Sequence, residues 1–504
     1  MPIFTSSKFK RPTIDFFPVL GLLGLVILFL SLSLLIPIII ALIYDETTWR
    51  AFLYAAAIAF ILGATLYYLF KPDRELRLRE GFLIVSLTWL VLSLIGALPF
   101  IFSGVLPSYT DAVFETMSGF TTTGATIFGG VTSSGFTNPN VETLPKSILF
   151  WRSLTHWIGG MGIVVLTIAI LPLLGVGGMQ LFKAESPGPT ADKLTPQIQE
   201  TAKLLWTVYM IITAAEFILL WLHPSMSWFD SLNHTFATVA TGGFSTKNNS
   251  IQAFNSVYVD AVITIFMFLS GISFAMHFRL LRGDVKSFLK NRETRFYTLI
   301  TVLSIIVISL SLWAFDNYSI GSAFRYSSFQ IVSIITTTGF GTDNFEFWYP
   351  LGQFLLFLLF FSGACAGSTA GGPKMIRWLI IIRNSFREFK QTLHPKAILP
   401  IRIGDKTVEP ETLRSVLSFI ALYIITFGLG ALAISGFGFD TKTAIGASIT
   451  CLGNIGPGWG AVGPAEGFAK IPYLGKWILT FLMMIGRLEI FTVLLIFTPS
   501  FWKQ

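Results

Sequence analysis

Long apolar segments alternate with short polar stretches along this 504-residue chain. A helix that crosses a hydrocarbon core needs about 20 apolar residues, and ten of the segments can form one. They cover residues 14–43, 51–70, 82–102, 148–174, 204–222, 257–278, 296–315, 354–382, 416–435 and 474–497. The pattern predicts ten membrane-spanning helices, of which the first two stand apart from the other eight.

The other eight segments form four pairs, and each pair encloses the same two features. The first is a short amphiphilic run, at 110–119, 228–239, 322–335 and 442–452. The second is a polar, glycine-containing turn: TTGAT at 122–126, TGGFST at 241–246, TTGFGT at 337–342 and NIGPG at 454–458. Non-helical backbone at membrane depth must be buried in protein or line a water-filled path. The pattern therefore predicts a unit of helix, short pore helix, loop and helix, repeated four times.

The four turns align on one glycine each. Asp111 lies 13 residues before Gly124 and Asp230 lies 13 residues before Gly243, with Gly242 as a one-residue alternative. Backbone carbonyls and Thr hydroxyls at such turns offer oxygen ligands to a dehydrated cation, as in the Thr-Val-Gly-Tyr-Gly filter of potassium channels. The residues predicted to coordinate a monovalent cation are Thr122, Thr123, Gly124, Thr241, Gly242, Gly243, Thr337, Thr338, Gly339, Asn454, Ile455 and Gly456.

The second helix of the third repeat is interrupted by small residues and a proline at 362–374. Such a segment cannot hold a stable helix in lipid, so protein must shield it or it must face the pore. We expect a movable plug beneath the loops, and the alternative is a packing kink made by small residues. The glycines assigned to this gate are Gly363, Gly367, Gly371 and Gly372.

Arg487 lies in the middle of the last apolar segment. An ionised residue within a span usually faces the protein interior or an aqueous cavity. We expect Arg487 to face the cation pathway and to discourage ions from resting below the loops. The alternatives are an ion pair with Glu489 or a side chain that reaches the inner surface.

Composition and charge place most of the chain in a membrane. Hydrophobic residues make up 53% of the chain, charged residues 12%, and the mean hydropathy is +0.70. A soluble protein carries about a quarter charged residues. With the N-terminus inside, 26 of the 35 Lys and Arg residues lie on the inner side and 8 on the outer side. This positive-inside bias predicts that both termini are cytoplasmic and that the four loops lie at the outer face.

The charge and the polar motifs argue against other classes of protein. The net charge of +8 follows the membrane topology, so it does not indicate a nucleic-acid partner. The two cysteines, Cys365 and Cys451, sit in apolar surroundings, and the five histidines lack metal-ligand spacing. No catalytic triad or phosphate-binding loop appears. We expect neither an enzyme nor an organic cofactor on this chain.

The motifs in combination resemble the Trk/Ktr/HKT superfamily of potassium transporters, nearest to the Trk membrane subunit, over essentially the full chain. They are TTTGA at 121–125, ATGGF at 240–244, TTTGF at 336–340 and NIGPG at 454–458, together with the broken segment and Arg487. The resemblance implies K⁺ as the transported ion and a homodimer with one pore per subunit. It also implies a gate formed by the intramembrane loop and the late arginine, and a cytosolic ring of nucleotide-binding regulatory subunits. Sodium-selective members tend to carry Ser where this chain has Gly124, which favours potassium.

We therefore expect an all-α integral membrane protein with four pseudo-symmetric repeats around one pore. The expected parts are an N-terminal helix pair at 1–80 and repeats at 81–195, 196–292, 293–408 and 409–504. The expected function is potassium uptake across a bacterial inner membrane. The alternative is a proton- or sodium-coupled symporter of the same fold, for which Glu216 and Glu489 are the mid-membrane carboxylates. A membrane enzyme is a more distant rival, because no catalytic constellation supports it.

Overall fold

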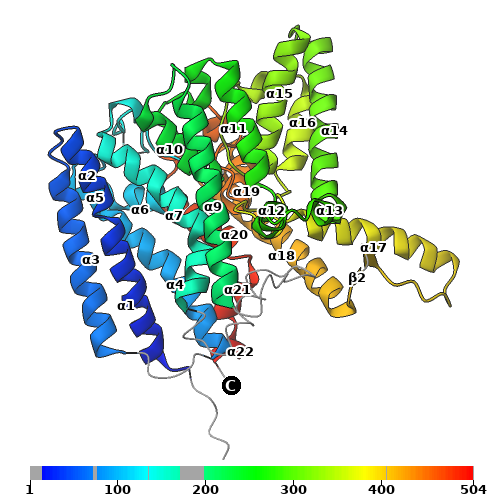
Figure 1. Ribbon diagram of the computed structural model, residues 1–504, viewed down its shortest axis with the longest axis horizontal. Helices are drawn as coiled ribbons and strands as arrows, with labels where there is room; N and C mark the ends of the chain where they lie inside the picture. The colour runs from blue at the N-terminus through cyan, green and yellow to red at the C-terminus, as the bar shows by residue number, and fades with distance from the viewer. Residues whose placement is uncertain (1–13, 72–76, 134, 171–197, 405, 503–504) are drawn as a thin grey trace, which may run out of the picture.

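The computed structural model describes residues 14–71, 77–133, 135–170, 198–404 and 406–502. Helices form nearly all of the regular structure in this part of the chain (Figure 1). Its two strands, β1 (Arg402–Ile403) and β2 (Lys406–Thr407), form a small antiparallel hairpin. The fold is therefore an all-α membrane protein with four pore repeats and an N-terminal helix pair, as predicted.

The N-terminal pair packs at one edge of the bundle (Figure 1). Helices α1 (Phe16–Ser33) and α2 (Ile36–Ile43) form one apolar span, and α3 (Trp49–Leu69) returns beside it. A Cβ atom at Gly24 would lie 2.8 Å from the Gly63 carbonyl oxygen, and one at Gly63 would lie 2.9 Å from the Gly24 oxygen. The two helices thus cross at small residues, as is common between membrane helices.

Each repeat contains a first helix, a short pore helix and a second helix. The first repeat has α4 (Leu78–Gly96) with α5 (Leu98–Phe102), then α6 (Tyr109–Phe120) and α7 (Lys146–Ile170). The second has α9 (Ile198–Trp221), α10 (Trp228–Val239), and α11 (Val257–Ser270) with α12 (Phe274–Leu281). The third has α14 (Arg292–Phe315), α15 (Ile320–Ile335), and α16 (Pro350–Leu359) with α17 (Met375–Leu393). The fourth has α18 (Pro410–Ser435), α19 (Thr441–Gly453), and α20 (Tyr473–Arg487) with α21 (Phe491–Leu494).

Short helices complete the described chain. Helix α13 (Val285–Lys290) joins the second and third repeats, and α22 (Pro499–Trp502) lies near the C-terminus. The 3-10 helices are η1 (Val141–Thr143), η4 (Ser250–Phe254), η5 (Phe345–Phe347), η6 (Gly460–Val462), η7 (Phe468–Lys470) and η8 (Leu495–Phe497). Most of them lie in the connections that follow the four polar turns.

The four pore helices start with the same local signal. A polar side chain at the N-cap accepts a hydrogen bond from the backbone N–H three residues later, which satisfies a donor that the helix leaves open. The four capping residues are Ser108, Ser227, Ser319 and Asp440. All four helices are largely buried, so they lie inside the ring of longer helices rather than against lipid.

The second helices are broken more often than we predicted. Six described helices are long and apolar enough to cross a membrane, or eight if each bent pair counts as one span. The bent pairs are α11 with α12, at 100°, and α20 with the helices at 491–497, at 115°. The expectation of continuous helices at 257–278 and 474–497 is therefore wrong. Gly271 ends α11, and Glu489 and Ile490 have left-handed φ values of +57° and +44°.

Two further predicted spans agree with the structure as far as it describes them. Helix α7 is described up to Ile170, and the predicted remainder at 171–174 lies outside the described residues. Helices α16 and α17 are separated by the predicted interruption at 362–374. The second helices of repeats two, three and four are thus all interrupted, whereas the sequence pattern pointed only to the third.

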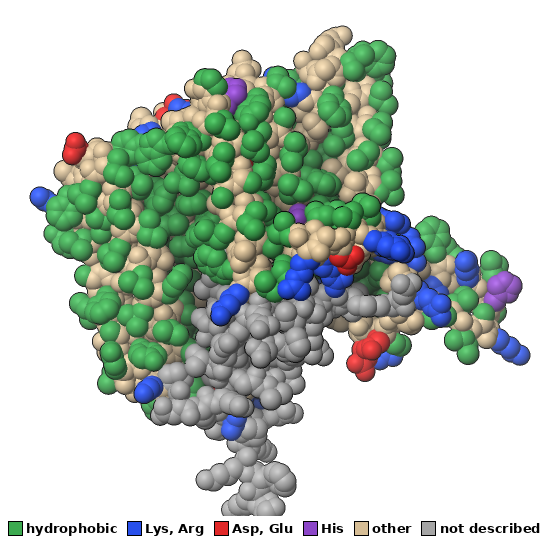
Figure 2. Space-filling view, viewed as in Figure 1, with side chains coloured by type: hydrophobic (Ala, Val, Ile, Leu, Met, Phe, Trp, Pro, Cys, Tyr) green, Lys and Arg blue, Asp and Glu red, His purple; other side chains and the backbone are tan. Residues whose placement is uncertain are grey.

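The outer wall of the bundle is apolar, and basic side chains gather at one end. Figure 2 shows hydrophobic side chains over the helical wall and Lys and Arg near α12, α13 and α17. On α14, Leu299, Ile306 and Trp313 are exposed. The exposed basic residues include Arg282, Lys286, Lys290, Arg383 and Lys390. This separation of apolar wall and basic end is what a bilayer demands of a protein that spans it.

Candidate functional site

The four polar turns meet in a closed ring. A Cβ atom added to the aligned glycine of each turn would lie closer than 3.0 Å to a carbonyl oxygen of the next turn. These contacts run from Gly124 to Gly242, from Gly243 to Thr338, from Gly339 to Ile455, and from Gly456 to Thr123. Each oxygen belongs to the residue just before an aligned glycine, so the contacts repeat around the ring. Four segments spread over more than 300 residues therefore surround one axis.

Glycine is required at the aligned positions for two reasons. The φ angles of Gly124, Gly243, Gly339 and Gly456 are +80°, +81°, +82° and +97°, in the region that favours glycine. The neighbouring carbonyl also leaves no room for a side chain. In the second repeat Gly243 takes the equivalent place, while Gly242 matches Thr123, Thr338 and Ile455. The alternative register through Gly242 is therefore not the one in the structure.

The pore helices end in the same way as well. The residue two before each aligned glycine is left-handed, with φ between +52° and +57°: Thr122, Thr241, Thr337 and Asn454. The next N–H donates to a carbonyl five residues back, from Thr123 to Ser118, Gly242 to Ala237, Thr338 to Ser333 and Ile455 to Thr450. This is the Schellman arrangement. A left-handed non-glycine residue costs roughly 1–2 kcal/mol, and such strain tends to cluster where function demands a special backbone.

The ring is suited to a cation. Each pore helix ends at the ring, and a helix C-terminus carries a partial negative charge of about half an elementary charge. The Thr and Asn side chains of the ring are fully buried. A cavity of about 240 Å³ lies outside the ring and is lined by all four aligned glycines. The structure thus brings all twelve predicted cation-coordinating residues to one place.

The segment between α16 and α17 lies against this ring. The Gly371 N–H donates to the Thr337 hydroxyl at 2.7 Å, and the Thr369 hydroxyl donates to the Val239 carbonyl at 2.9 Å. A Cβ atom at Gly371 would lie 2.6 Å from the Gly453 carbonyl oxygen. This intramembrane segment, residues 362–374, therefore contacts the second, third and fourth repeats directly beside their turns.

The four glycines of the predicted gate do not all lie together. Gly363, Gly371 and Gly372 are mutual neighbours next to the fourth turn. Gly367 lies apart, where its carbonyl accepts a hydrogen bond from Phe274 N at the break between α11 and α12. The segment thus extends from the ring to the break between α11 and α12, rather than forming one compact plug.

Arg487 is buried and joins three repeats. Its Nη1 donates to the Thr369 carbonyl at 2.7 Å, and its Nη2 donates to the Gly159 carbonyl at 2.9 Å. Glu489 forms an ion pair with Arg377 of α17 instead. The alternative of an Arg487–Glu489 pair is therefore wrong. Arg487 faces the protein interior, where it holds the intramembrane segment against α7.

Comparisons with known proteins agree with this geometry. A family profile described as TrkH, cation transport protein, matches residues 49–504. The chain belongs to the TrkH family. It is 42% identical over 491 residues to the Trk system potassium uptake protein TrkH of Halomonas elongata, covering 96% of this chain and 99% of that protein. It is 36% identical over 485 residues to the Trk system potassium uptake protein TrkG of Escherichia coli, covering 95% and 97%.

A solved TrkH structure has the same fold. The crystal structure of the potassium transporter TrkH from Vibrio parahaemolyticus matches with a TM-score of 0.86 and 37% identity, covering 97% of this chain and 100% of that chain. The predicted family is thereby confirmed. The TrkH family is one of transport proteins, so this chain is a multi-pass membrane transporter rather than an enzyme.

In this TrkH-family chain the acidic residues near the pore helices hold structure together. For acids near these helices, such as Asp111 and Glu115, the sequence favours simple solvation over the alternative that they attract cations to the mouth. Both are buried: Asp111 lies 2.5 Å from Lys476, and Glu115 lies 2.8 Å from Arg152. Neither interpretation holds for these two, because helix packing buries both side chains and pairs them with cations of the protein itself. In the part of the chain that the structure describes, no group of three His, Cys, Asp or Glu side chains could hold a metal ion.

Sequence reasoning missed one residue that anchors the intramembrane segment. Glu293, in the first turn of α14, accepts hydrogen bonds from Ala366 N at 2.7 Å and Ile376 N at 3.1 Å. One carboxylate oxygen thus ties the segment to the start of α17. The sequence signal was an acidic residue at the start of a span, which by itself resembles an ordinary helix N-terminus.

Proposed function

We propose that this TrkH-family protein takes up K⁺ across the bacterial inner membrane through the ring of four turns. The observation that carries the proposal is the closed ring formed by Gly124, Gly243, Gly339 and Gly456. Its relatives named above are potassium uptake proteins. K⁺ is the transported ion, and the chain needs no organic cofactor of its own.

The twelve ring residues act as the selectivity filter. Their carbonyl and hydroxyl oxygens replace the hydration shell of K⁺, and the pore-helix ends stabilise the bare charge. A Cβ atom at Gly124 would lie 2.2 Å from the Gly242 carbonyl oxygen, so Ser at this position would push the first and second turns apart. This supports K⁺ over Na⁺.

The intramembrane segment and Arg487 act as the gate. The segment lies between the ring and the basic end of the bundle, and the Arg487 bond to Thr369 holds it in place. Opening then means breaking the Arg487 and Gly371 bonds and moving the segment aside. The buried guanidinium also disfavours a cation resting nearby, because like charges repel strongly in a low dielectric.

The basic end of the bundle is the cytoplasmic end in this proposal, with both termini on that side. Basic residues of cytoplasmic loops orient membrane proteins, and here they gather at α12, α13 and α17. The protein works as a homodimer within the membrane lipid. A cytosolic ring of nucleotide-binding regulatory subunits docks on the same basic end and controls the gate.

Coupled transport is the alternative. A proton- or sodium-coupled symporter of this fold needs a carboxylate within the membrane, and Glu216 of α9 is fully buried there. Glu489 is less suited to that role, because it is already paired with Arg377.

Ion flux from the purified protein in liposomes tests the proposal. Potassium and sodium are compared at a set voltage, with the pH or the sodium gradient then varied. The filter is supported if the voltage-driven K⁺ flux exceeds the Na⁺ flux and does not change with the pH gradient or the sodium gradient. K⁺ flux that stops without a proton or sodium gradient favours the symporter, and absence of K⁺ flux overturns the proposal.

A further inference from the structure

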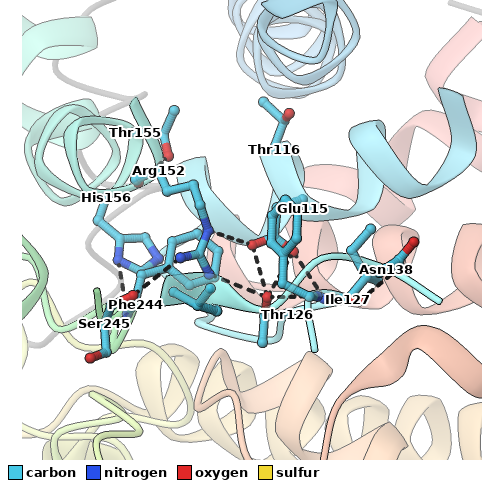
Figure 3. A network of polar contacts seen from close by, with 12 residues as sticks. Glu115, Thr116, Thr126, Ile127, Asn138, Arg152, Thr155, His156, Phe244 and Ser245 are labelled. Carbon is cyan, nitrogen blue, oxygen red and sulfur yellow. Dashed lines mark hydrogen bonds and ion pairs between the residues drawn. The ribbon is translucent and has the colours of Figure 1, made fainter. Parts of the chain in front are cut away.

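One buried ion pair lies directly behind the first two turns of the ring. Arg152 of α7 and Glu115 of α6 have side chains that are 2% and 0% exposed, and Arg152 Nε lies 2.8 Å from Glu115 Oε1. Figure 3 shows the two side chains reaching toward each other beside Thr126 and Phe244. Arg152 also lines the cavity outside the ring. A charged group thus lies next to the proposed ion pathway, although its side chain is only 2% exposed.

The pair binds both turns at once. On the side of the first turn, Glu115 accepts from Ile127 N at 3.0 Å and from the Thr126 hydroxyl at 3.0 Å. On the side of the second turn, Arg152 Nη1 donates to the Ser245 carbonyl at 3.2 Å. Since Thr126 and Ser245 each lie two residues beyond an aligned glycine, the pair bridges equivalent positions of the two turns.

Aromatic contacts reinforce the second turn. The Arg152 guanidinium lies 4.2 Å from the ring centroid of Phe244, and the His156 ring stacks on Phe244 with centroids 4.1 Å apart. Phe244 directly follows Gly243. Arg152 and His156 are one helical turn apart on α7, so this helix holds the second turn by a cation–π contact and a stacked ring.

Among the equivalent positions of the four pore helices, only the position in the first repeat holds an acidic residue. The positions nine residues before the aligned glycines are Glu115, His234, Gln330 and Ala447, and all four are buried. Of these four residues, Glu115 is the acidic one, and it is paired with Arg152. The ring is therefore supported differently at the boundary between its first and second turns than elsewhere.

We infer that Arg152 and Glu115 act as one positioning unit that sets the spacing of the first and second turns and, through it, the preference for K⁺ over Na⁺. This inference rests on the proposed filter function. The planar guanidinium makes its separate bonds to Glu115, Ser245 and Thr126 in fixed directions, which a lysine ammonium cannot reproduce. The paired Glu115 charge keeps the unit neutral, so the arginine does not repel the ions that pass.

The test measures the K⁺/Na⁺ permeability ratio, from reversal potentials, of the full-length protein in liposomes or planar bilayers. Arg152→Lys keeps the positive charge but cannot make the separate bonds to Glu115, Ser245 and Thr126. The permeability ratio should therefore fall by about tenfold, which corresponds to about 1.4 kcal/mol. Arg152→Gln/Glu115→Gln leaves no unpaired buried charge, so it should fold and should show a similar fall. The matched control is Arg325→Lys, because Arg325 pairs with Asp260 between α15 and α11 at 2.7 Å.

The outcomes separate the inference from the function on which it rests. A lowered ratio in both Arg152 variants, with a wild-type ratio in the Arg325→Lys control, supports the unit. A wild-type ratio in Arg152→Lys and in the folded double variant overturns it. An equal fall in the control also overturns it, because the effect would then belong to any ion pair. Absence of K⁺ flux through the unaltered protein would instead refute the proposed function.

Discussion

Arg487 Nη1 lies 2.7 Å from the carbonyl oxygen of Thr369, although the two residues belong to different repeats. A second bond joins Arg487 to Gly159 of the first repeat. The intramembrane segment is thus tied by one guanidinium to two neighbouring repeats. Its release requires the loss of hydrogen bonds from a charged donor, which are among the stronger contacts in a protein.

Replacing Arg487 by alanine should loosen the gate. Hydrogen bonds to charged groups contribute about 1.5–3 kcal/mol each, so the released state should gain at least about tenfold in population. We expect K⁺ flux in liposomes to rise to a similar extent. Arg414→Ala is a control at an exposed position of α18 and should leave the flux unchanged. Equal flux in Arg487→Ala and the unaltered protein would contradict the gating role.

Replacing Gly339 by serine should weaken the preference for K⁺. Gly339 has φ of +82° and faces the Ile455 carbonyl, so a side chain there forces the third and fourth turns apart. We expect a lower K⁺/Na⁺ permeability ratio by about tenfold or more, since this distortion falls on the coordinating oxygens themselves. Gly341→Ser is the matched control, because a Cβ atom there meets nothing within 4 Å. An unaltered ratio in Gly339→Ser would argue against this turn as part of the filter.

Replacing Glu293 by alanine should free the intramembrane segment. The change removes the acceptor of the Ala366 and Ile376 N–H groups. We expect faster hydrogen exchange in peptides covering 362–376 and a higher K⁺ leak. Glu293→Gln retains an acceptor oxygen and should stay near the unaltered protein in both measurements. Unchanged exchange in Glu293→Ala would show that packing alone holds the segment.

Replacing Lys476 by methionine should destabilise the whole bundle. Lys476 of α20 and Asp111 of α6 form a fully buried pair between the fourth and first repeats, and removing one partner leaves an unpaired charge. Such a loss typically costs about 3–5 kcal/mol. We expect a lower thermal unfolding temperature in detergent. The double variant Asp111→Asn/Lys476→Met should recover most of the loss, and failure to recover would mean that the cost came from packing.

The sequence by itself determined the local elements of the pore. The predicted runs at 110–119 and 228–239 lie close to α6 and α10, because capping residues, apolar content and turn glycines act within a few residues of each other. The alignment on Gly124, Gly243, Gly339 and Gly456 also came from local spacing. Glycine is the residue that fits a left-handed φ angle with a carbonyl oxygen packed against its Cα atom, so the residue type alone indicates the backbone conformation at these positions.

The tertiary structure decided which charged residues meet. Asp111 pairs with Lys476 across 365 residues of chain, and Glu489 pairs with Arg377 rather than Arg487. It also decided the breaks near Gly271 and Ile490, where long apolar runs carried no strong helix-breaking signal. Such partners and bends depend on how the repeats pack around the axis. A buried charge is stabilised by a counter-charge that the packing of the helices brings next to it, and a local sequence pattern does not indicate which residue that is.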